Sequence, residues 1–162
     1  MLIPTYQRPQ KLAACVASLA RQAGDVAFEV IVGLDGADAA SELAARRAWT
    51  GATQRRALRV VECERAGYTM VRNRLVREAR GRVMLSLNDD VVAEPELVER
   101  HWREHERRRR HGRGPAIVVG DAPYTRRPPG ELDSMLDRLV RETSMVFFYD
   151  AMNGPEIGRA HV

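Results

Sequence analysis

Apolar residues occur along this chain in short continuous runs that alternate with helical repeats. Five runs rich in apolar or β-branched residues predict strands, over residues 1–4, 28–34, 58–63, 82–87 and 116–120. Between them, apolar residues three or four positions apart predict helices, over residues 9–24, 41–49, 67–79, 95–110 and 131–143. Strands that alternate with helices in this way are typical of parallel β-α-β units. We therefore expect an α/β fold, with helices on both faces of a mostly parallel, doubly wound sheet in three α/β/α layers.

Polar residues and glycines follow four of the predicted strands directly. In open parallel sheets, ligands bind beyond the carboxyl ends of the strands, where the connecting loops leave a crevice. The segments at these ends are residues 4–6, 35–36, 62–67 and 88–90. A ligand site is expected at this edge of the sheet.

Asn88, Asp89 and Asp90 come directly after an apolar strand. Three oxygen-bearing side chains in this place suit a hard cation such as Mg²⁺ or Mn²⁺, which takes one or two carboxylates and completes its shell with phosphate oxygens and water. The alternative is a polar turn that caps the helix beginning at Pro95. The spacing alone does not separate these two interpretations.

Three further residues near the strand ends have both a functional and a structural interpretation. Asp35 either binds a ligand or forms, with Gly36, a common turn pair. Arg72 either reaches a phosphate held at the N-terminus of its helix or belongs to a solvated helix face. Tyr6 either stacks on a flat ring or covers the sheet edge.

The strand-end motifs, taken together and in order, carry a resemblance to a known family. They are Ile3–Pro9, Phe28–Gly36, Gly67 with Val71-Arg72-Asn73 and Ala79-Arg80-Gly81, and Leu85–Asp90. In this order they resemble the family 2 glycosyltransferases of the GT-A type, over roughly residues 2–110. The resemblance implies transfer of a sugar from a nucleoside-diphosphate sugar donor to a hydroxyl of a carbohydrate or other acceptor. It also implies inversion at the anomeric carbon and assistance by Mg²⁺ or Mn²⁺.

The resemblance further implies roles for the residues at the strand ends. The residues that would line the nucleobase pocket are Pro4, Thr5 and Tyr6. Asp35 would bind the base or the ribose, and Arg72 would lie near the diphosphate, with Arg8 as a second candidate for a phosphate contact. The family's Asp-x-Asp motif corresponds to Asn88, Asp89 and Asp90, with Asp90 as the metal ligand and the other two as donor-binding residues.

Two positions depart from the family pattern. Asn88 stands where the family has the first Asp, which weakens a bidentate metal site but leaves Asp90. An amide oxygen is still able to bind a ribose hydroxyl or a metal-bound water. Leu34 stands where the family often has another Asp.

The attacking hydroxyl needs a general base within hydrogen-bond reach, and the resemblance places this base downstream, on the acceptor side. The carboxylates available there are Glu131, Asp133, Asp137, Glu142 and Asp150. The first four fall on the predicted helix over residues 131–143 and fit its charged face, so none is assigned as the base. We expect residues 1–155 to be the nucleotide-sugar-binding part of a domain whose acceptor half is missing, and this part to be inactive alone.

Composition and charge narrow the functional classes. The chain has 162 residues with 44% hydrophobic ones, which is enough for one domain with a real core. Its 26 basic residues, all arginine except Lys11, exceed its 22 acidic ones, a skew that a GC-rich genome also produces. No apolar run approaches the roughly 18 residues of a membrane span. No export signal is visible and both cysteines are read as reduced, so a cytoplasmic protein is expected, peripheral to a membrane at most.

Two other motifs suggest different functions. His101-Trp102-Arg103-Glu104-His105 spells the H-x-x-E-H pattern of zinc peptidases, but Glu/Arg pairs at helical spacing favour a solvated helix face. The arginines of residues 107–113 are either a nucleic-acid or anionic-membrane patch or a basic helix end that complements the helix dipole. The runner-up function is accordingly a non-catalytic nucleotide-binding or nucleic-acid-binding basic α/β module, although no nucleic-acid partner is expected.

The two ends of the chain also carry expectations. The first strand begins at the first residue, so part of it is expected to lie upstream. Residues 156–162 correspond, in one reading frame, to a translated sequencing adaptor followed by a stop. We expect these residues to be a non-native tail outside the fold.

Overall fold

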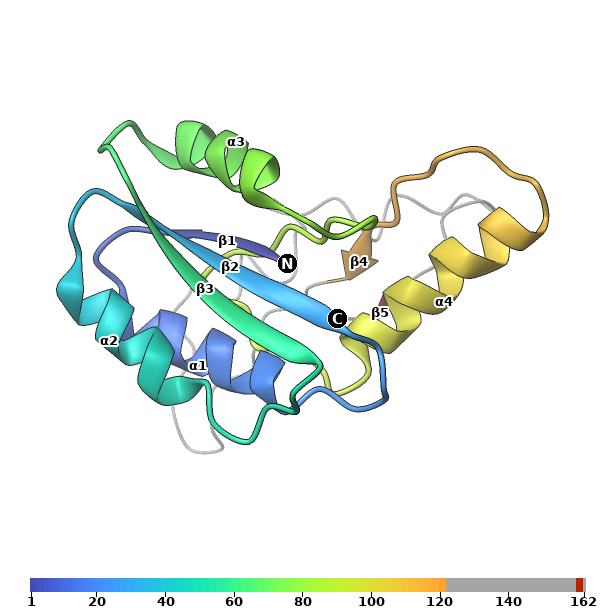
Figure 1. Cartoon of the computed structure of the whole chain (residues 1–162), viewed down its shortest axis with the longest axis horizontal. Helices are drawn as coiled ribbons and strands as arrows, with labels where there is room; N and C mark the ends of the chain where they lie inside the picture. Colours follow the sequence, from blue (N-terminus) through green and yellow to red (C-terminus); the bar gives the residue numbers. More distant parts are fainter. Residues whose placement is uncertain (122–159, 162) are drawn as a thin grey trace, which may run out of the picture.

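The centre of the molecule is a three-stranded parallel sheet in the order β1-β2-β3 (Figure 1). The computed structural model describes residues 1–121 and 160–161. The strands of this sheet are β1 (Leu2–Thr5), β2 (Phe28–Asp35) and β3 (Arg56–Cys63). Ile3 pairs with Val32 and Val32 with Val60, so the apolar runs of the sequence lie side by side. The parallel pairing confirms the predicted α/β class.

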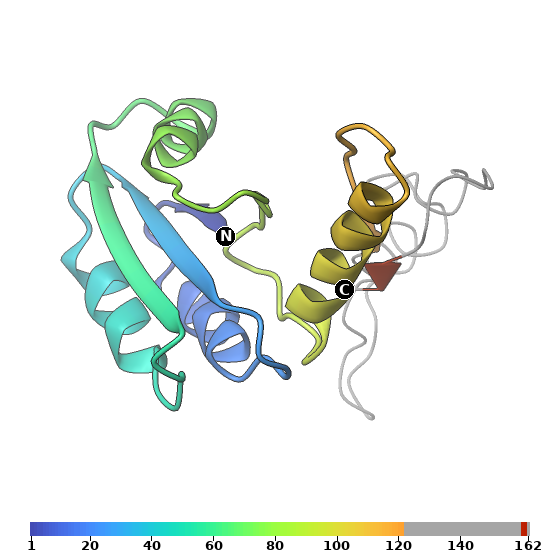
Figure 2. The same ribbon diagram turned by 45° about the vertical axis from the view of Figure 1, so that its right-hand side comes forward.

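Helices cover both faces of this sheet, as the alternation predicted (Figures 1 and 2). On one face lie α1 (Pro9–Ala20) and α2 (Ala39–Ala48), and on the other lies α3 (Tyr68–Glu78). Successive strand residues point to opposite faces. Val30 and Val32 therefore join the core under α1 and α2, whereas Ile31 packs with Val71 and Leu75 of α3. The result is the three-layer α/β/α arrangement.

A glycine in β2 allows α3 to lie very close to the sheet. A Cβ built on Gly33 would be 2.6 Å from Val71 Cγ1 and 3.0 Å from Leu75 Cδ2. Any larger residue would push the helix away, so this glycine determines how near the N-terminal half of α3 approaches the end of β2. The first turn of α3 is one wall of the site described below.

The strand predicted over residues 82–87 is largely wrong, because only one bridge forms there. Leu2 pairs with Ser86, and the Leu2 N–H donates to the Leu85 carbonyl at 2.9 Å. The Leu87 N–H donates back to the Leu2 carbonyl at 3.0 Å. In a strand every second residue faces the same neighbour, so the next donor from β1 would be Pro4. Proline has no N–H, so the ladder does not continue past residue 87. Residues 82–84 precede the stretch that pairs with Leu2, the first residue of β1, so no β1 residue lies opposite them.

The remaining elements lie beyond the sheet. Helix α4 (Leu97–Arg110) confirms the predicted helix and buries Leu97 and Val98 at its start. The strand predicted over residues 116–120 is wrong: only β4 (Gly120–Asp121) forms, paired in parallel with β5 (Ala160–His161). Within the described residues the run before β4 has no partner strand, and Ile117 is 93% exposed.

The helix predicted over residues 131–143 lies outside the described residues, as do the carboxylates considered for the general base. Among the helices that are described, none combines the length and the apolar character that crossing a bilayer demands.

Candidate functional site

A cleft of about 300 Å³ opens at the carboxyl ends of β1 and β2. Every predicted site residue except Arg72 lines this cleft, namely Pro4, Thr5, Tyr6, Arg8, Asp35, Asn88, Asp89 and Asp90. Two further lining residues, Tyr68 and Val71, come from the first turn of α3. Segments that are more than eighty residues apart in sequence, such as Thr5 and Asp89, thus meet at one edge of the sheet.

Asp89 connects the turn after residue 87 to the end of β1. Asp89 is only 6% exposed, and its Oδ2 accepts a hydrogen bond of 2.7 Å from Thr5 Oγ1. Its Oδ1 lies 3.4 Å from Arg8 Nη1. Because a buried carboxylate needs such partners to offset its desolvation, Asp89 holds the turn in place.

Asp90 is the more accessible carboxylate of the pair, with 41% of its side chain exposed. Its Oδ2 lies 3.6 Å from Arg8 Nη1 and 3.9 Å from Lys11 Nζ, both at the start of α1. Lys11 was missed in the sequence, although its place one helical turn after Arg8 puts it on the same side of the helix. The Asp90 carboxylate is open to the cleft and lies among cations.

Asp35 determines the shape of the loop that leads into α3. Its Oδ1 accepts hydrogen bonds from the backbone N–H groups of Ala66 at 2.8 Å and Gly67 at 3.0 Å. Gly67 has a φ of +86°, a conformation that favours glycine. Asp35 is therefore a loop-organising residue as well as a wall of the cleft.

Arg72 does not line the cleft, but it contacts Tyr68, which does. The Tyr68 hydroxyl donates to Asn88 Oδ1 at 2.8 Å, and Arg72 donates to the same hydroxyl. The Arg72 guanidinium also lies over the tyrosine ring, 4.4 Å from its centroid. Partial burial lowers the pKa of Arg72 from its usual value. The sequence signal for Tyr68 was its position directly after Gly67, at the first residue of the helix.

The segment that carries Tyr6 and Arg8 is held in an unusual backbone conformation. Gln7 has a φ of +51°, and its N–H donates to Asp38 Oδ2 at 2.9 Å. Burial opposes ionisation of Asp38, but its hydrogen bonds from Ser41 and Gln7 outweigh burial and lower its pKa. Beside this turn, the Arg65 guanidinium lies 4.8 Å from the centroid of the Tyr6 ring.

Cys15 lies behind the cleft as a protonated thiol. Its Sγ is 3.6 Å from the Asn88 carbonyl oxygen, and its residue is 1% exposed. Burial, together with the charges of Asp89 and Asp90, raises the pKa of Cys15 to about 12. Both cysteines are free, as expected. Cys15 therefore serves packing and does not provide a nucleophile at neutral pH.

No group of three or more His, Cys, Asp or Glu side chains within the described residues is arranged to hold a metal ion. Mg²⁺ and Mn²⁺ do not require such a group, because one or two carboxylates with phosphate oxygens and water complete their shell. Asp90, an exposed carboxylate with Asp35 in the same cleft, fits this oxygen chemistry.

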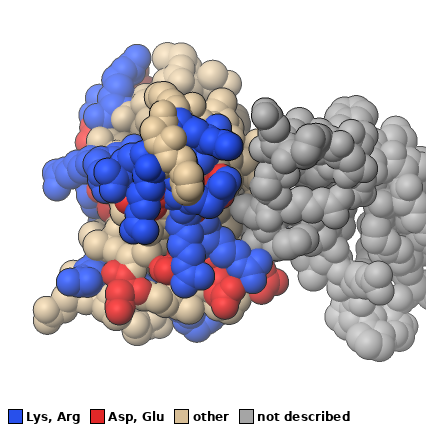
Figure 3. Space-filling view, turned by 90° about the vertical axis from the view of Figure 1, so that its right-hand side faces the viewer, with Lys and Arg blue, Asp and Glu red and all other residues tan. Residues whose placement is uncertain are grey.

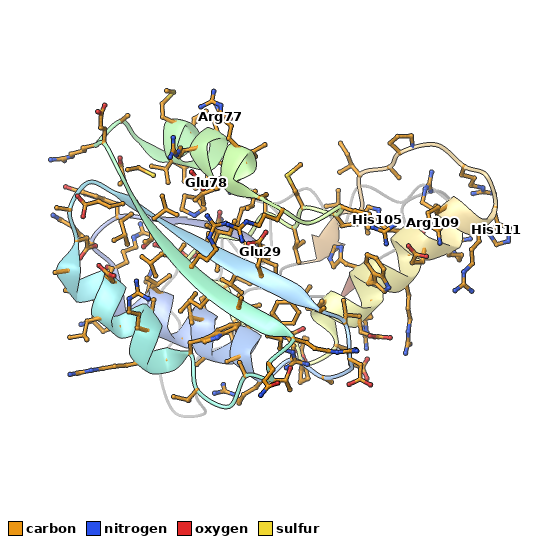
Figure 4. The ribbon with its side chains drawn as sticks, in the orientation of Figure 1. Glu29, Arg77, Glu78, His105, Arg109 and His111 are labelled. Carbon is orange, nitrogen blue, oxygen red and sulfur yellow. The ribbon has the colours of Figure 1, made fainter. Side chains whose placement is uncertain are left out.

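The side chains of the H-x-x-E-H segment are not among any group that could hold a metal ion within the described residues. His101 is 5% exposed and lines a mostly apolar cavity of about 120 Å³, and burial lowers its pKa. His105 and Arg109 lie further along α4, away from the sheet (Figure 4). Glu96, which precedes α4, and the glutamates of α4 pair with arginines of this helix, as Glu96–Arg100, Glu99–Arg103, Glu104–Arg107 and Glu106–Arg109. The predicted solvated face is confirmed for these Glu/Arg pairs, whereas His101 turns into the protein interior. Figure 3 shows basic and acidic side chains mixed on the side of the molecule where α4 ends.

Fold and cleft together define an α/β protein with a polar site at the carboxyl edge of a parallel sheet. Residues 1–155 match the family described as glycosyl transferase family 2. The chain belongs to this family.

A solved structure has the same fold. It is the mannosyltransferase PcManGT from Pyrobaculum calidifontis, in complex with GDP-Man and Mn²⁺, with a TM-score of 0.52 and 23% sequence identity. The match covers 60% of this chain and 29% of that chain, so this chain spans well under two thirds of that protein's length. No curated protein matches the sequence.

Proposed function

We propose that this chain binds the nucleoside-diphosphate sugar of an inverting, metal-assisted glycosyltransferase. The observation that carries the proposal is the cleft at the carboxyl ends of β1 and β2, in which four segments from distant parts of the sequence meet. Membership of glycosyl transferase family 2 supports sugar transfer as the reaction. The fold of a mannosyltransferase that binds GDP-Man supports a nucleotide sugar as the donor.

The proposed roles follow the placement of the side chains. Tyr6 and its neighbours Pro4 and Thr5 would enclose the nucleobase. Asp35 would bind the base or ribose through Oδ2, because its Oδ1 already accepts two backbone hydrogen bonds. Arg8, whose side chain is 53% exposed, would contact a phosphate.

Asp90 would hold a divalent cation, Mg²⁺ or Mn²⁺. The cation would stabilise the negative charge that develops on the departing diphosphate. Arg8 and Lys11 now face the same carboxylate, so both side chains would turn toward the diphosphate when a cation binds. The Mn²⁺ in the mannosyltransferase complex supports a divalent metal.

Catalysis also needs a base that takes the proton from the acceptor hydroxyl. Inversion follows from direct attack on the sugar from the face opposite the diphosphate. No catalytic residue is assigned, and the downstream carboxylates stay candidates. We propose that the chain alone binds donor without transferring it to a carbohydrate or other hydroxyl acceptor. Its cytoplasmic location and any peripheral membrane contact stay predictions.

The test is the thermal shift of this chain with UDP, GDP and dTDP, each with Mn²⁺ and with EDTA. A shift with a nucleotide that is larger in Mn²⁺ than in EDTA would support the proposal, because a ligand that binds only the folded state raises the melting temperature. A shift with polynucleotide alone would favour the basic-module alternative. Absence of any nucleotide shift at saturating concentration would contradict donor binding.

A further inference from the structure

The hydrogen bonds next to Asn88 run in one direction, starting at Arg72. A guanidinium group has donors and no acceptor, so Arg72 donates to the Tyr68 hydroxyl. The hydroxyl in turn donates to Asn88 Oδ1 at 2.8 Å. The guanidinium also lies over the Tyr68 ring, 4.4 Å from its centroid. These contacts hold the tyrosine in one orientation between α3 and the turn of residues 88–90.

This direction determines which end of the Asn88 amide is available to a ligand. An asparagine side chain has an acceptor oxygen and a donor NH₂ group. The Asn88 Oδ1 accepts a hydrogen bond from the Tyr68 hydroxyl, whereas the Asn88 Nδ2 forms no hydrogen bond within the described residues. Asn88 lines the cleft and is exposed. It therefore offers a hydrogen-bond donor where an aspartate would offer only acceptors.

We propose that Tyr68 is a positioning residue that orients the Asn88 amide so that its Nδ2 donates to a diphosphate oxygen of the bound nucleotide. This inference rests on the proposed function. A charged phosphate oxygen is the strongest acceptor that a nucleoside diphosphate offers. Hydrogen bonds in a chain polarise one another, so the cation of Arg72 strengthens each later donor up to the amide. The charge of Arg72 thus acts on the cleft through Tyr68.

The metal requirement follows from the same arrangement. An amide N–H does not ligate a metal ion, so Asn88 binds the diphosphate without a cation, and Asp90 is left as the carboxylate for the metal. Replacing Asn88 by aspartate removes the donor and adds a negative charge. It also creates a second carboxylate ligand two residues before Asp90. The Asn88→Asp variant should bind nucleotide poorly without metal. Its nucleotide affinity should increase more than that of the native chain when metal is added.

The experiment is isothermal titration calorimetry of this chain with GDP and with UDP, each in EDTA and in Mn²⁺. For Asn88→Asp we expect affinity in EDTA to fall at least about tenfold, consistent with losing a charge-assisted hydrogen bond and adding repulsion. The ratio of the Kd in EDTA to the Kd in Mn²⁺ should rise. Tyr68→Phe keeps the ring under Arg72 and removes only the hydroxyl, and it should weaken binding by about 2- to 10-fold in both buffers.

Asn73→Asp is the matched control, because Asn73 is exposed on α3, does not line the cleft and undergoes the same chemical change. It should bind like the native chain, and thermal unfolding should show that all variants are folded. Native affinity of Asn88→Asp in EDTA, an unchanged metal ratio, or native affinity of Tyr68→Phe would each overturn the inference. Lack of binding by the native chain would instead refute the proposed function, and with it this inference.

Discussion

Two adjacent residues of the same type, Asp89 and Asp90, have different roles in this cleft. Asp89 is buried and accepts a hydrogen bond from Thr5, whereas the Asp90 side chain is 41% exposed and, among the described residues, pairs with the long, exposed side chains of Arg8 and Lys11. The buried Asp89 carboxylate therefore links the turn of residues 88–90 to the end of β1. Exposure leaves the second free to exchange its partners for a metal ion.

Asp90→Ala should therefore remove the gain in nucleotide affinity that Mn²⁺ provides while leaving the fold intact. We expect the Kd of the variant for GDP or UDP to be the same in Mn²⁺ and in EDTA, as measured by calorimetry. Asp25→Ala is the control, because Asp25 is an exposed aspartate outside the cleft. A variant that kept the Mn²⁺ dependence of the native chain would show that another group binds the metal.

At the scale of elements, the closeness of α3 to β2 positions Tyr68 and Val71 on the cleft. This closeness depends on Gly33, at which a Cβ would lie 2.6 Å from Val71 Cγ1. The far end of α3 is held by Arg59, which bonds Glu29 at 3.3 Å and Glu78 at 2.9 Å. Figure 4 shows Glu78 at the end of α3 and Glu29 on the sheet below it.

Gly33→Ala should lower the free energy of unfolding by about 1–3 kcal/mol, the usual effect of overpacking a core. It should also weaken nucleotide binding, because the helix that carries Tyr68 has to move. Urea denaturation and calorimetry measure the two effects. Gly114→Ala is the control, since a Cβ there meets nothing within 4 Å. Native stability of Gly33→Ala would mean that α3 adjusts without cost.

Stability should depend on the ionisation of Glu29. Burial opposes its charge, but the Arg80 N–H and the Arg59 guanidinium outweigh burial and lower the pKa of Glu29 from 4.5. A lowered folded-state pKa gives stability that is present above the unfolded value, near 4.5, and is lost as the pH falls through the folded value. Urea denaturation from about pH 6 to pH 3 should show this loss, and Glu29→Gln should reduce it.

Glu62→Gln serves as the control for this pH series, because Glu62 is exposed and forms no ion pair within the described residues. Its stability should fall with pH as the native chain does. An equally steep fall in Glu29→Gln would assign the acid sensitivity to other carboxylates.

At the scale of the whole molecule, the residues of the cleft pack directly against the main hydrophobic core. Cys15 belongs to the core beneath α1, and its Sγ contacts the carbonyl of Asn88. The site residues therefore rest on the same packing that stabilises the domain. Loss of the fold and loss of the cleft should occur together.

The rate at which Cys15 reacts with an alkylating reagent should show whether the region behind the cleft opens only when the whole fold unfolds. Because its pKa is about 12 and its residue is 1% exposed, alkylation at pH 8 should be negligible until the molecule unfolds. In Cys63→Ala, iodoacetamide labelling followed by mass spectrometry should rise with urea along the unfolding transition. Rapid labelling without urea would show that the region behind Asn88 opens independently of global unfolding.

Much of the fold was determined by the sequence itself, because periodicity records which faces a strand or helix buries. The runs around Val30 and Val32 predicted buried parallel strands, and Leu12, Cys15 and Val16 predicted the inner face of α1. Strand ends carry ligands in such folds, so most of the cleft was also predictable. The family resemblance rested on the same segments.

Tertiary structure decided what local pattern does not contain. Whether residues 82–87 form a strand depended on their register with β1, which begins at Leu2 and pairs there with Ser86. The difference in burial between Asp89 and Asp90 gives these two adjacent carboxylates different roles. Hydrogen bonds across the cleft brought in Tyr68 and oriented the Asn88 amide. Sequence spacing predicts which faces are apolar, whereas partners, burial and hydrogen-bond direction arise only when distant segments meet.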